Sequence, residues 1–305
     1  MSRLATALAL SALAFCGCGS VPRRLPVQTR ASPKARLAGS GPIRIAVIVM
    51  ESKGYGEVIG SRQAPFINGL ARTFGLASGM YAISHPSLPN YLALTGGSTF
   101  GIGSDCTGCS VAKTGIVDQL SAAGISWKAY MEDMPQPCYT GARAGRYAKK
   151  HDPFVYYREI VANPYRCSNV VPFSQLQTDI ASRQLPSFVW ITPNLCHDMH
   201  DCSVAGGDRF LGGIVPSLLQ ALGPRGVLFL TWDEGNADDA GCCRLASGGH
   251  VASVVAGAGA KRGARLDTPV DHYSLLQTIE DLFGLPRLRG AACGCTPSLQ
   301  PLLEH

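Results

Sequence analysis

Three features are missing from this chain of 305 residues, and each absence argues against a class of protein. No stretch after the N-terminal region reaches about 18 uninterrupted apolar residues, so no transmembrane helix is predicted. No internal repeat is visible, which argues against a repeat architecture. No Gly-x-Ser-x-Gly elbow surrounds the serine singled out below, which argues against an ordinary serine hydrolase.

The formal charge of +6 comes from the N-terminal region rather than from the rest of the chain. Residues 1–44 contain seven Arg or Lys residues and no acid, which leaves 20 of the 27 basic groups beside all 21 acidic groups. Because this remainder is close to neutral, the composition indicates no nucleic-acid partner.

Residues 1–18 predict an export signal. Arg3 supplies a positive charge, the apolar run LATALALSALAF follows, and the small residues CGCGS come next. Cys18 leaves a lipid-modified N-terminus open as an alternative. Residues 19–41 are basic and Pro-rich and predict a flexible tether without a core of its own. We therefore expect an exported protein, secreted or periplasmic, whose folded domain spans residues 42–305.

The chain has 12 cysteines, and ten of them lie beyond the predicted export signal. An even number of cysteines in an exported chain favours disulfides. The spacing allows short loops closed by Cys106/Cys109 and Cys196/Cys202, and a longer one closed by Cys138/Cys167. The alternative is a zinc site, built either from the motif CTGC or from the cysteines at 242, 243, 293 and 295.

Short apolar, β-branched runs alternate with helical patterns, and this alternation is typical of βαβ units. Strands are predicted at 43–50, 125–131, 187–193, 226–232 and 251–257. Helices are predicted at 64–75, 88–97, 115–124, 172–184, 209–223 and 271–284, the last with Asp271 as N-cap and Gly284 as its stop. Residues 132–170 have irregular spacing and are expected to be a surface excursion. The predicted fold class is α/β, with a mainly parallel central sheet flanked by helices.

Polar residues follow three of these strands directly. Glu51 and Ser52 come after the first, the segment NLCHDMHD after the third, and Asp233 and Glu234 after the fourth. In open α/β sheets, ligands bind outside the carboxyl ends of the strands. Acidic and imidazole side chains are therefore expected to converge on one edge of the sheet and to form a functional site.

Glu51, Asp233 and Glu234 are candidate metal ligands. Three carboxylates packed together repel one another and raise their own pKa values, and a divalent cation between them removes that repulsion. Hard oxygen ligands favour Ca²⁺, Mg²⁺ or Mn²⁺. We therefore expect one divalent metal ion, with Zn²⁺ and iron as alternatives that the sequence leaves open.

Ser87, in the segment SHPSLPNY at 84–91, is the candidate nucleophile. Its hydroxyl needs a base or a metal for activation. The helix that begins at this point would direct backbone N–H groups toward the same spot, which favours a phosphate ester over an uncharged acyl group. Asn90, one turn further on, could donate an amide hydrogen bond to a phosphate oxygen.

The histidines supply the remaining candidates. His197 and His200, in the motif CHDMHD with Asp198 and Asp201, could protonate a leaving alkoxide or bind phosphate. His250 follows two glycines and is a candidate phosphate-binding residue. His85 is expected to be a turn residue, and His272 to belong to the capped start of the last helix.

Five segments together resemble the bacterial phosphoesterase family, which includes acid phosphatases, phosphatidylinositol 3-phosphate phosphatases and phospholipases C with an alkaline-phosphatase-like fold. The segments are IVMESKGYGEVIG, SHPSLPNYLALTGG, FVWITPNLCHDMHD, LFLTWDEG and DHYSLLQTIEDLFG, in the order of that family and spanning about residues 43–287.

The resemblance implies a role for each matching residue. Glu51, Asp233 and Glu234 stand at metal ligands, Ser87 stands at the nucleophile, which also binds the metal, and His197 stands at a histidine that assists the leaving group. The family usually carries Asn after the first Glu and Ser two positions later, whereas this chain has Ser52 and Gly54. Ser52 is therefore a candidate ligand that puts the metal preference in question.

These observations lead to an expected function. The chain is expected to be an exported, metal-dependent phosphomonoesterase that forms a phosphoserine at Ser87. Its substrate would be a small phosphate ester or a phosphoinositide head group. A phospholipase C-like phosphodiesterase is the nearer alternative, and a non-catalytic surface binding protein is the farther one. The sequence gives no indication of an oligomeric state.

Overall fold

A computed structural model describes residue 37, residues 40–236 and residues 246–304 of the chain. The predicted export signal at 1–18 and most of the predicted tether at 19–41 lie outside the described residues. Cys18, Cys242 and Cys243 lie outside them as well.

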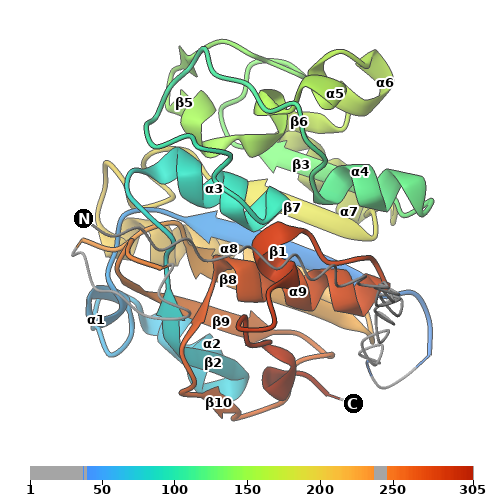
Figure 1. Cartoon of the computed structure of the whole chain (residues 1–305). Coiled ribbons are helices and arrows are strands. Elements are labelled where there is room, and N and C mark those ends of the chain that lie inside the picture. Colours follow the sequence, from blue (N-terminus) through green and yellow to red (C-terminus); the bar gives the residue numbers. More distant parts are fainter. Residues whose placement is uncertain (1–36, 38–39, 237–245, 305) are drawn as a thin grey trace, which may run out of the picture. The chain divides into compact units, whose positions relative to one another are not determined.

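A nine-stranded sheet forms the centre of the described region, with the strand order β10-β2-β9-β8-β1-β7-β3-β6 and with β11 also paired to β2 (Figure 1). Neighbouring strands run parallel except for β9, which is antiparallel to both β2 and β8. The strands are β1 (Arg44–Met50), β2 (Gly75–Tyr81), β3 (Trp127–Met131), β6 (Val170–Pro172), β7 (Phe188–Thr192), β8 (Gly226–Trp232), β9 (His250–Ala256), β10 (Arg265–Leu266) and β11 (Val270–Asp271). A separate two-stranded ribbon pairs β4 (Arg143–Ala144) with β5 (Tyr147–Ala148).

Strands β1 and β8 lie side by side at the centre of the sheet. Every residue of β8 is buried, as is every residue of β1 after Arg44. Such continuous apolar runs are typical of parallel strands that are covered on both faces. The register pairs Met50 with Trp232, so the residues that follow the two strands emerge next to each other.

Helices cover both faces of the sheet (Figure 1). Helix α8 packs on β1 and β8 and contacts α2 and α7, whereas α3 contacts α9 and α4. The helices are α1 (Tyr55–Val58), α2 (Pro65–Thr73), α3 (Ser87–Gly96), α4 (Ile116–Ala122), α5 (Arg158–Val161), α6 (Pro164–Cys167), α7 (Ser174–Ala181), α8 (Val204–Leu222) and α9 (His272–Phe283), with 3₁₀ turns η1 (Lys149–His151), η2 (Pro153–Tyr156), η4 (Arg289–Ala292) and η5 (Gln300–Leu302). Within the described ranges, no helix combines the length and the apolar character needed to cross a membrane.

The predicted fold class is confirmed, and so are the five predicted strands and six predicted helices, to within a few residues at their ends. Asp271 caps α9, because its side chain accepts a hydrogen bond from the backbone N–H of Ser274. Gly284 ends the helix in the left-handed conformation, with φ of 69°. His272 lies at the start of this helix, as expected.

The short elements α1, β10 and β11 were not predicted, and two larger regions also differ from the prediction. Strand β2 was not predicted, because its sequence GLASGMY contains two glycines and no β-branched residue. The expectation of a surface excursion at 132–170 holds only in part. Most residues before 147 and after 157 in this stretch are exposed, but η2 and the residue after it bury Phe154, Val155, Tyr156 and Tyr157 against the core.

The three disulfides that the spacing allowed are present, and they join Cys106 to Cys109, Cys138 to Cys167 and Cys196 to Cys202. A fourth joins Cys293 to Cys295. A disulfide-bonded sulfur cannot act as a thiolate ligand, so neither CTGC nor the 293/295 pair is free to build the alternative zinc site.

Candidate active site

The carboxyl ends of β1 and β8 bring Glu51 next to Asp233. The backbone N–H of Asp233 donates to the carbonyl of Met50 over 2.9 Å, which extends the strand pairing by one residue. The backbone N–H of Glu51 in turn donates to the carbonyl of Asp198, at 2.8 Å, in the segment that follows β7. Three strand ends are thus held together by backbone hydrogen bonds, as the sequence indicated.

Ser87 reaches the same edge from β2. It is the first residue of α3 and is 1% exposed. Its Oγ lies 3.2 Å from Oε2 of Glu51 and 3.3 Å from Oε1 of Glu234. The hydroxyl therefore faces two carboxylates and stands at the N-terminus of a ten-residue helix.

Asn90 holds the loop that carries Ser87. Its Oδ1 accepts the backbone N–H groups of Ile83 and Ser84, at 2.9 and 3.0 Å. Its Nδ2 donates to the carbonyls of Ser84 and Pro86, at 2.7 and 3.2 Å. Since both amide hydrogens are engaged with the backbone, this side chain positions Ser87 and does not point at a ligand.

Ser52 adopts a left-handed conformation, with φ of 50°. A non-glycine residue in this region is strained and is commonly found at functional sites. Its backbone N–H donates to Oδ1 of Asp233 over 3.1 Å, and its hydroxyl lies 3.4 Å from Oε2 of Glu51. The turn therefore aims both the amide and the hydroxyl of Ser52 at the carboxylates.

We call Glu51, Asp233 and Glu234 the carboxylate side of the site. One oxygen from each lies within 4.8 Å of the other two. Burial, together with the charge of Asp198, raises the pKa of Glu51 well above its ordinary value. Burial and the charges of Glu51 and Glu234 likewise raise the pKa of Asp233. Three carboxylates in this arrangement are unfavourable unless a proton or a cation lies among them.

The carboxylate side fits a divalent metal ion. Oδ2 of Asp233 is buried and has no hydrogen-bond partner among the described residues. Such an orphaned oxygen is the position from which a carboxylate binds a cation. The donors are hard oxygens, which suit Ca²⁺, Mg²⁺ and Mn²⁺.

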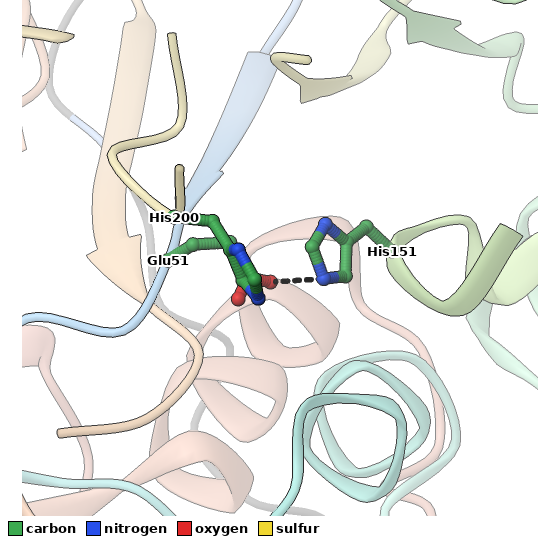
Figure 2. Close-up of side chains that lie close together, drawn as sticks. All are labelled: Glu51, His151 and His200. Carbon is green, nitrogen blue, oxygen red and sulfur yellow. Dashed lines mark ion pairs between the residues drawn. The ribbon is translucent and has the colours of Figure 1, made fainter. Parts of the chain in front are cut away.

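We call Lys150, His151 and His200 the histidine–lysine side. Figure 2 shows the rings of His151 and His200 beside Glu51. One side-chain atom that could bind a metal, taken from each of Glu51, His151 and His200, lies within 4.8 Å of the other two. Nε2 of His151 is 3.1 Å from Oε1 of Glu51, and its Nδ1 is 3.3 Å from Oδ2 of Asp198. Burial, aided by the charge of Lys150, lowers the pKa of His151 well below its ordinary value.

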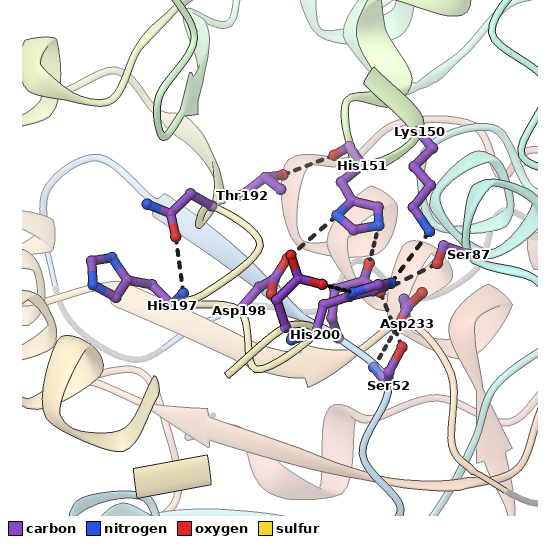
Figure 3. A network of polar contacts seen from close by, with 12 residues as sticks. Ser52, Ser87, Lys150, His151, Thr192, His197, Asp198, His200 and Asp233 are labelled. Atoms are coloured by element: carbon purple, nitrogen blue, oxygen red, sulfur yellow. Dashed lines mark hydrogen bonds and ion pairs between the residues drawn. The ribbon is translucent and has the colours of Figure 1, made fainter. Parts of the chain in front are cut away.

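Lys150 lies between this pair of imidazoles and the start of α3. Its Nζ is 2.9 Å from Oδ2 of Asp105 and 3.5 Å from Nε2 of His200 (Figure 3). Burial alone would lower the pKa of Lys150, but the hydrogen bond and charge of Asp105 raise it. Lys150 and His151 were missed because they follow no apolar strand. The only signal in the sequence is the run KKHDPF, in which charged residues precede a proline and a buried aromatic.

His197 lies apart from Ser87. Figure 3 places it at the margin of the network, with Ser87 on the opposite margin. Its Nδ1 is 2.8 Å from Oε1 of Glu132, and its ring stacks on Phe210 with centroids 4.5 Å apart. Of the two histidines in CHDMHD, the structure therefore brings His200 to the carboxylates and turns His197 toward Glu132.

Two further histidines lie near the edge. The ring of His250 stacks between Tyr55 and Tyr81, at centroid distances of 4.5 and 5.0 Å, and its Nε2 is 2.7 Å from the carbonyl of Ser78. His85, expected to be a turn residue, lies in the loop after β2 and its Nδ1 contacts the carboxylate of Glu234. His250 thus packs among tyrosines, whereas His85 reaches the carboxylate side.

Residues 56–286 match the phosphoesterase family. The chain belongs to this family. Glu51 and Ser52 precede the matched residues, while Ser87, Asp233 and Glu234 lie within them. The family assignment and the homologues below establish the chain as a hydrolase of phosphoric esters.

The chain is similar to several phosphatases. It is 34% identical over 262 residues to a phosphatidylinositol-3-phosphatase of Mycobacterium tuberculosis, which covers 84% of this chain and 83% of that protein. It is 29% identical over 276 residues to an acid phosphatase of Aspergillus fumigatus, which covers 86% of this chain but 60% of that protein. The chain thus spans only part of the length of this fungal phosphatase.

Solved structures support the fold of this phosphoesterase. A protein of the alkaline phosphatase superfamily from Vibrio parahaemolyticus aligns with a TM-score of 0.57 and 13% identity, over 84% of this chain and 71% of that one. A phosphonate monoester hydrolase from Silicibacter pomeroyi aligns with a TM-score of 0.53 and 11% identity, over 87% and 76%. The fold is therefore alkaline-phosphatase-like, as the sequence predicted.

Proposed function

We propose that this phosphoesterase is an exported, metal-dependent phosphomonoesterase in which Ser87 is the nucleophile. The observation that carries the proposal is the position of the Ser87 hydroxyl, buried between Glu51 and Glu234 at the N-terminus of α3. A helix N-terminus favours a negatively charged group such as phosphate. Export is supported by the four disulfides, which persist in oxidising compartments.

The metal would be held by Glu51, Asp233, Glu234 and the Ser87 hydroxyl, with Ser52 beside them. When bound, a divalent cation there would favour the alkoxide form of Ser87 and stabilise negative charge on the transferring phosphoryl group. The Ser52 amide fixes Asp233 through its 3.1 Å hydrogen bond. Ser52 thereby orients a ligand carboxylate even where its own hydroxyl stays unbound.

The chain's residues then carry two displacements at phosphorus. Ser87 loses its hydroxyl proton to solvent, Oγ attacks the phosphorus atom, the bond to the alcohol breaks, and a phosphoserine forms. Water attacks the phosphoserine in the second displacement, which releases inorganic phosphate and restores the hydroxyl. We assign the proton transfer to the leaving oxygen to His200, because it lies beside Glu51 whereas His197 is engaged with Glu132.

The remaining residues have supporting parts. His151 is buried between Glu51 and Asp198 and orients the first of these carboxylates. Asn90 orients the loop that carries Ser87 through four hydrogen bonds. We assign His250 to the packing of Tyr55 and Tyr81 rather than to the phosphate.

The proposed substrates are phosphate monoesters, including a phosphoinositide head group. The head group is favoured by the 34% identity to a phosphatidylinositol-3-phosphatase across 83% of that protein. A phosphodiesterase of the phospholipase C type is the rival function, and a binding protein without turnover is the other. Hydrolysis of p-nitrophenyl phosphate and of p-nitrophenyl phosphorylcholine distinguishes the proposed phosphomonoesterase from the phosphodiesterase.

The deciding experiment is Ser87→Ala in the full chain. We expect the variant to lose at least about 10³-fold in kcat on p-nitrophenyl phosphate, as for removal of a nucleophile in other hydrolases. Ser182→Ala is the matched control, because that hydroxyl bonds only to backbone carbonyls of α7 in the described structure. Unchanged turnover by Ser87→Ala, in a preparation that carries its metal, refutes the mechanism.

A further inference from the structure

We propose that Lys150 is a substrate-binding residue that makes the site selective for phosphate monoesters over diesters. The inference rests on the proposed function and deepens it, because it names the chemical feature by which the site chooses its substrate. The feature is the second negative charge of a monoester, which a diester lacks.

Position is the first argument. Lys150 belongs to η1 and directly precedes His151, whose ring faces Glu51. Its Nζ lies 3.5 Å from Nε2 of His200, so the ammonium group stands beside the imidazole that lies next to Glu51 (Figure 3). The side chain is 23% exposed, so it is not sealed inside the protein.

Charge is the second argument. Five carboxylates lie at or beside the site: Glu51, Asp105, Asp198, Asp233 and Glu234. One divalent ion offsets two of these charges, so without a further cation such as Lys150 an incoming dianion would still meet net repulsion. A lysine ammonium is charged throughout the range in which phosphate monoesters are dianions, above about pH 6. Lys150 thus supplies attraction that grows with the charge of the phosphoryl group.

Pre-organisation is the third argument. Asp105 accepts the backbone N–H of Leu88 over 3.0 Å and the ammonium of Lys150 over 2.9 Å, so one carboxylate ties Lys150 to the first turn of α3. Lys149 makes a second attachment, with its Nζ 2.7 Å from the carbonyl of Thr107. The loop that contains Thr107 and directly follows Asp105 is closed by the disulfide between Cys106 and Cys109. Lys150 is therefore fixed relative to Ser87, unlike a free surface lysine.

The test compares Lys150→Gln, Lys150→Arg and wild type on p-nitrophenyl phosphate and bis(p-nitrophenyl) phosphate at pH 8. We expect Lys150→Gln to lose roughly 100-fold in kcat/KM on the monoester, the size of one charge-assisted hydrogen bond, and less than about 5-fold on the diester. Lys150→Arg should recover part of the monoester rate. An equal loss on both substrates, or no loss, overturns the inference.

Lys128→Gln is the matched control, because Lys128 makes an ion pair of the same kind with Asp179, at 2.6 Å and with a side-chain exposure of 28%. This variant should leave the ratio of the two rates unchanged. A change in the ratio equal to that of Lys150→Gln would show that loss of any such ion pair alters the site, and the assignment would fail.

Binding of inorganic phosphate, measured by calorimetry, separates this inference from the proposed function. Lys150→Gln should weaken phosphate binding about 10-fold or more even in the Ser87→Ala background, where no turnover is needed. Equal affinity for phosphate in Ser87→Ala with and without Lys150→Gln refutes the role of Lys150, whether or not Ser87 is the nucleophile. Asp105→Asn should weaken binding less, and should add nothing to Lys150→Gln, because Asp105 acts by positioning the lysine.

Discussion

The carboxylate side and the histidine–lysine side of the site reach Ser87 by different routes. The carboxylates come directly after β1 and β8, two central strands that are buried except for Arg44 and whose register leaves little freedom. Lys150 and His151 come from a 3₁₀ turn in a long connection after β3, held by a carboxylate and a disulfide-closed loop. The strands fix the carboxylates, whereas side-chain contacts with Asp105 and Asp198 fix Lys150 and His151.

This difference suggests a division of labour. The carboxylate side is suited to a permanent cation, which needs rigid oxygen ligands at short distances. In the proposed function, the histidine–lysine side would supply a proton through His200 and a positive charge through Lys150 to the bound substrate. Variants of the two sides should therefore differ in metal content, turnover and stability, and three experiments measure these properties.

The largest effect is expected from Asp233→Asn. The substitution removes a ligand charge from the carboxylate side, and we expect a loss of about 10³-fold in kcat/KM together with loss of bound metal, since a metal ion contributes several kcal/mol to charge stabilisation. Elemental analysis and turnover of p-nitrophenyl phosphate are the measurements. Asp281→Asn, which alters a buried acid bonded to Arg287, is the control and should retain its metal. Normal metal content in Asp233→Asn would contradict the assignment of metal binding to the carboxylate side.

A smaller effect is expected on the other side. His200→Gln should lower kcat on p-nitrophenyl phosphate about 10²-fold while metal content stays normal, because a general acid contributes about that factor. His197→Gln should change kcat less than about 3-fold, since His197 contacts Glu132 and Phe210 instead. The reverse order of the two variants would return the leaving-group role to His197, as the sequence alone suggested.

The smallest effect is a shift in stability with pH. Burial raises the pKa values of Glu51 and Asp233, so without metal the folded state binds protons that the unfolded state releases above about pH 4. Stability of the chelated protein should therefore fall as pH rises from that point, whereas the metal-loaded protein should resist this loss. The difference in Tm between the two forms should widen from pH 5 to pH 8.

Other buried acids titrate in the same direction but do not belong to the carboxylate side. Burial raises the pKa of Asp152 to about 7 and that of Glu280 to about 8. Their contribution is present with and without metal, so it cancels in the difference between the two Tm values. A difference that stays constant from pH 5 to pH 8 contradicts a cation bound by the carboxylates.

Much of this architecture was predictable from sequence. The five strands and six helices were predicted from their apolar runs and helix caps. The acids after β1 and β8 were identified because they directly follow such runs. Strand β2 was not predicted, because its sequence GLASGMY has a low intrinsic β-propensity and the strand is stabilised by pairing with β9. Its omission hid the reason why Ser87 arrives at the same edge.

The histidines mark the limit of such predictions. Within CHDMHD, His197 contacts Glu132 whereas His200 lies beside Glu51, and Met199 between the two histidines has φ of 81°. No periodicity in the sequence encodes that turn. Lys150 and His151 were hidden for a related reason, because their position depends on contacts with Asp105 and Asp198, which are far away in the chain.

One carboxylate joins both sides of the site. Oε1 of Glu51 faces the Tyr91 hydroxyl at 2.7 Å and His151 at 3.1 Å, while Oε2 faces Ser87 at 3.2 Å. Replacement of His151 removes one of the two contacts that hold Oε1, so it is expected to change the orientation of Oε2 beside the Ser87 hydroxyl as well. Changes made on the histidine–lysine side should therefore require compensating changes around Glu51.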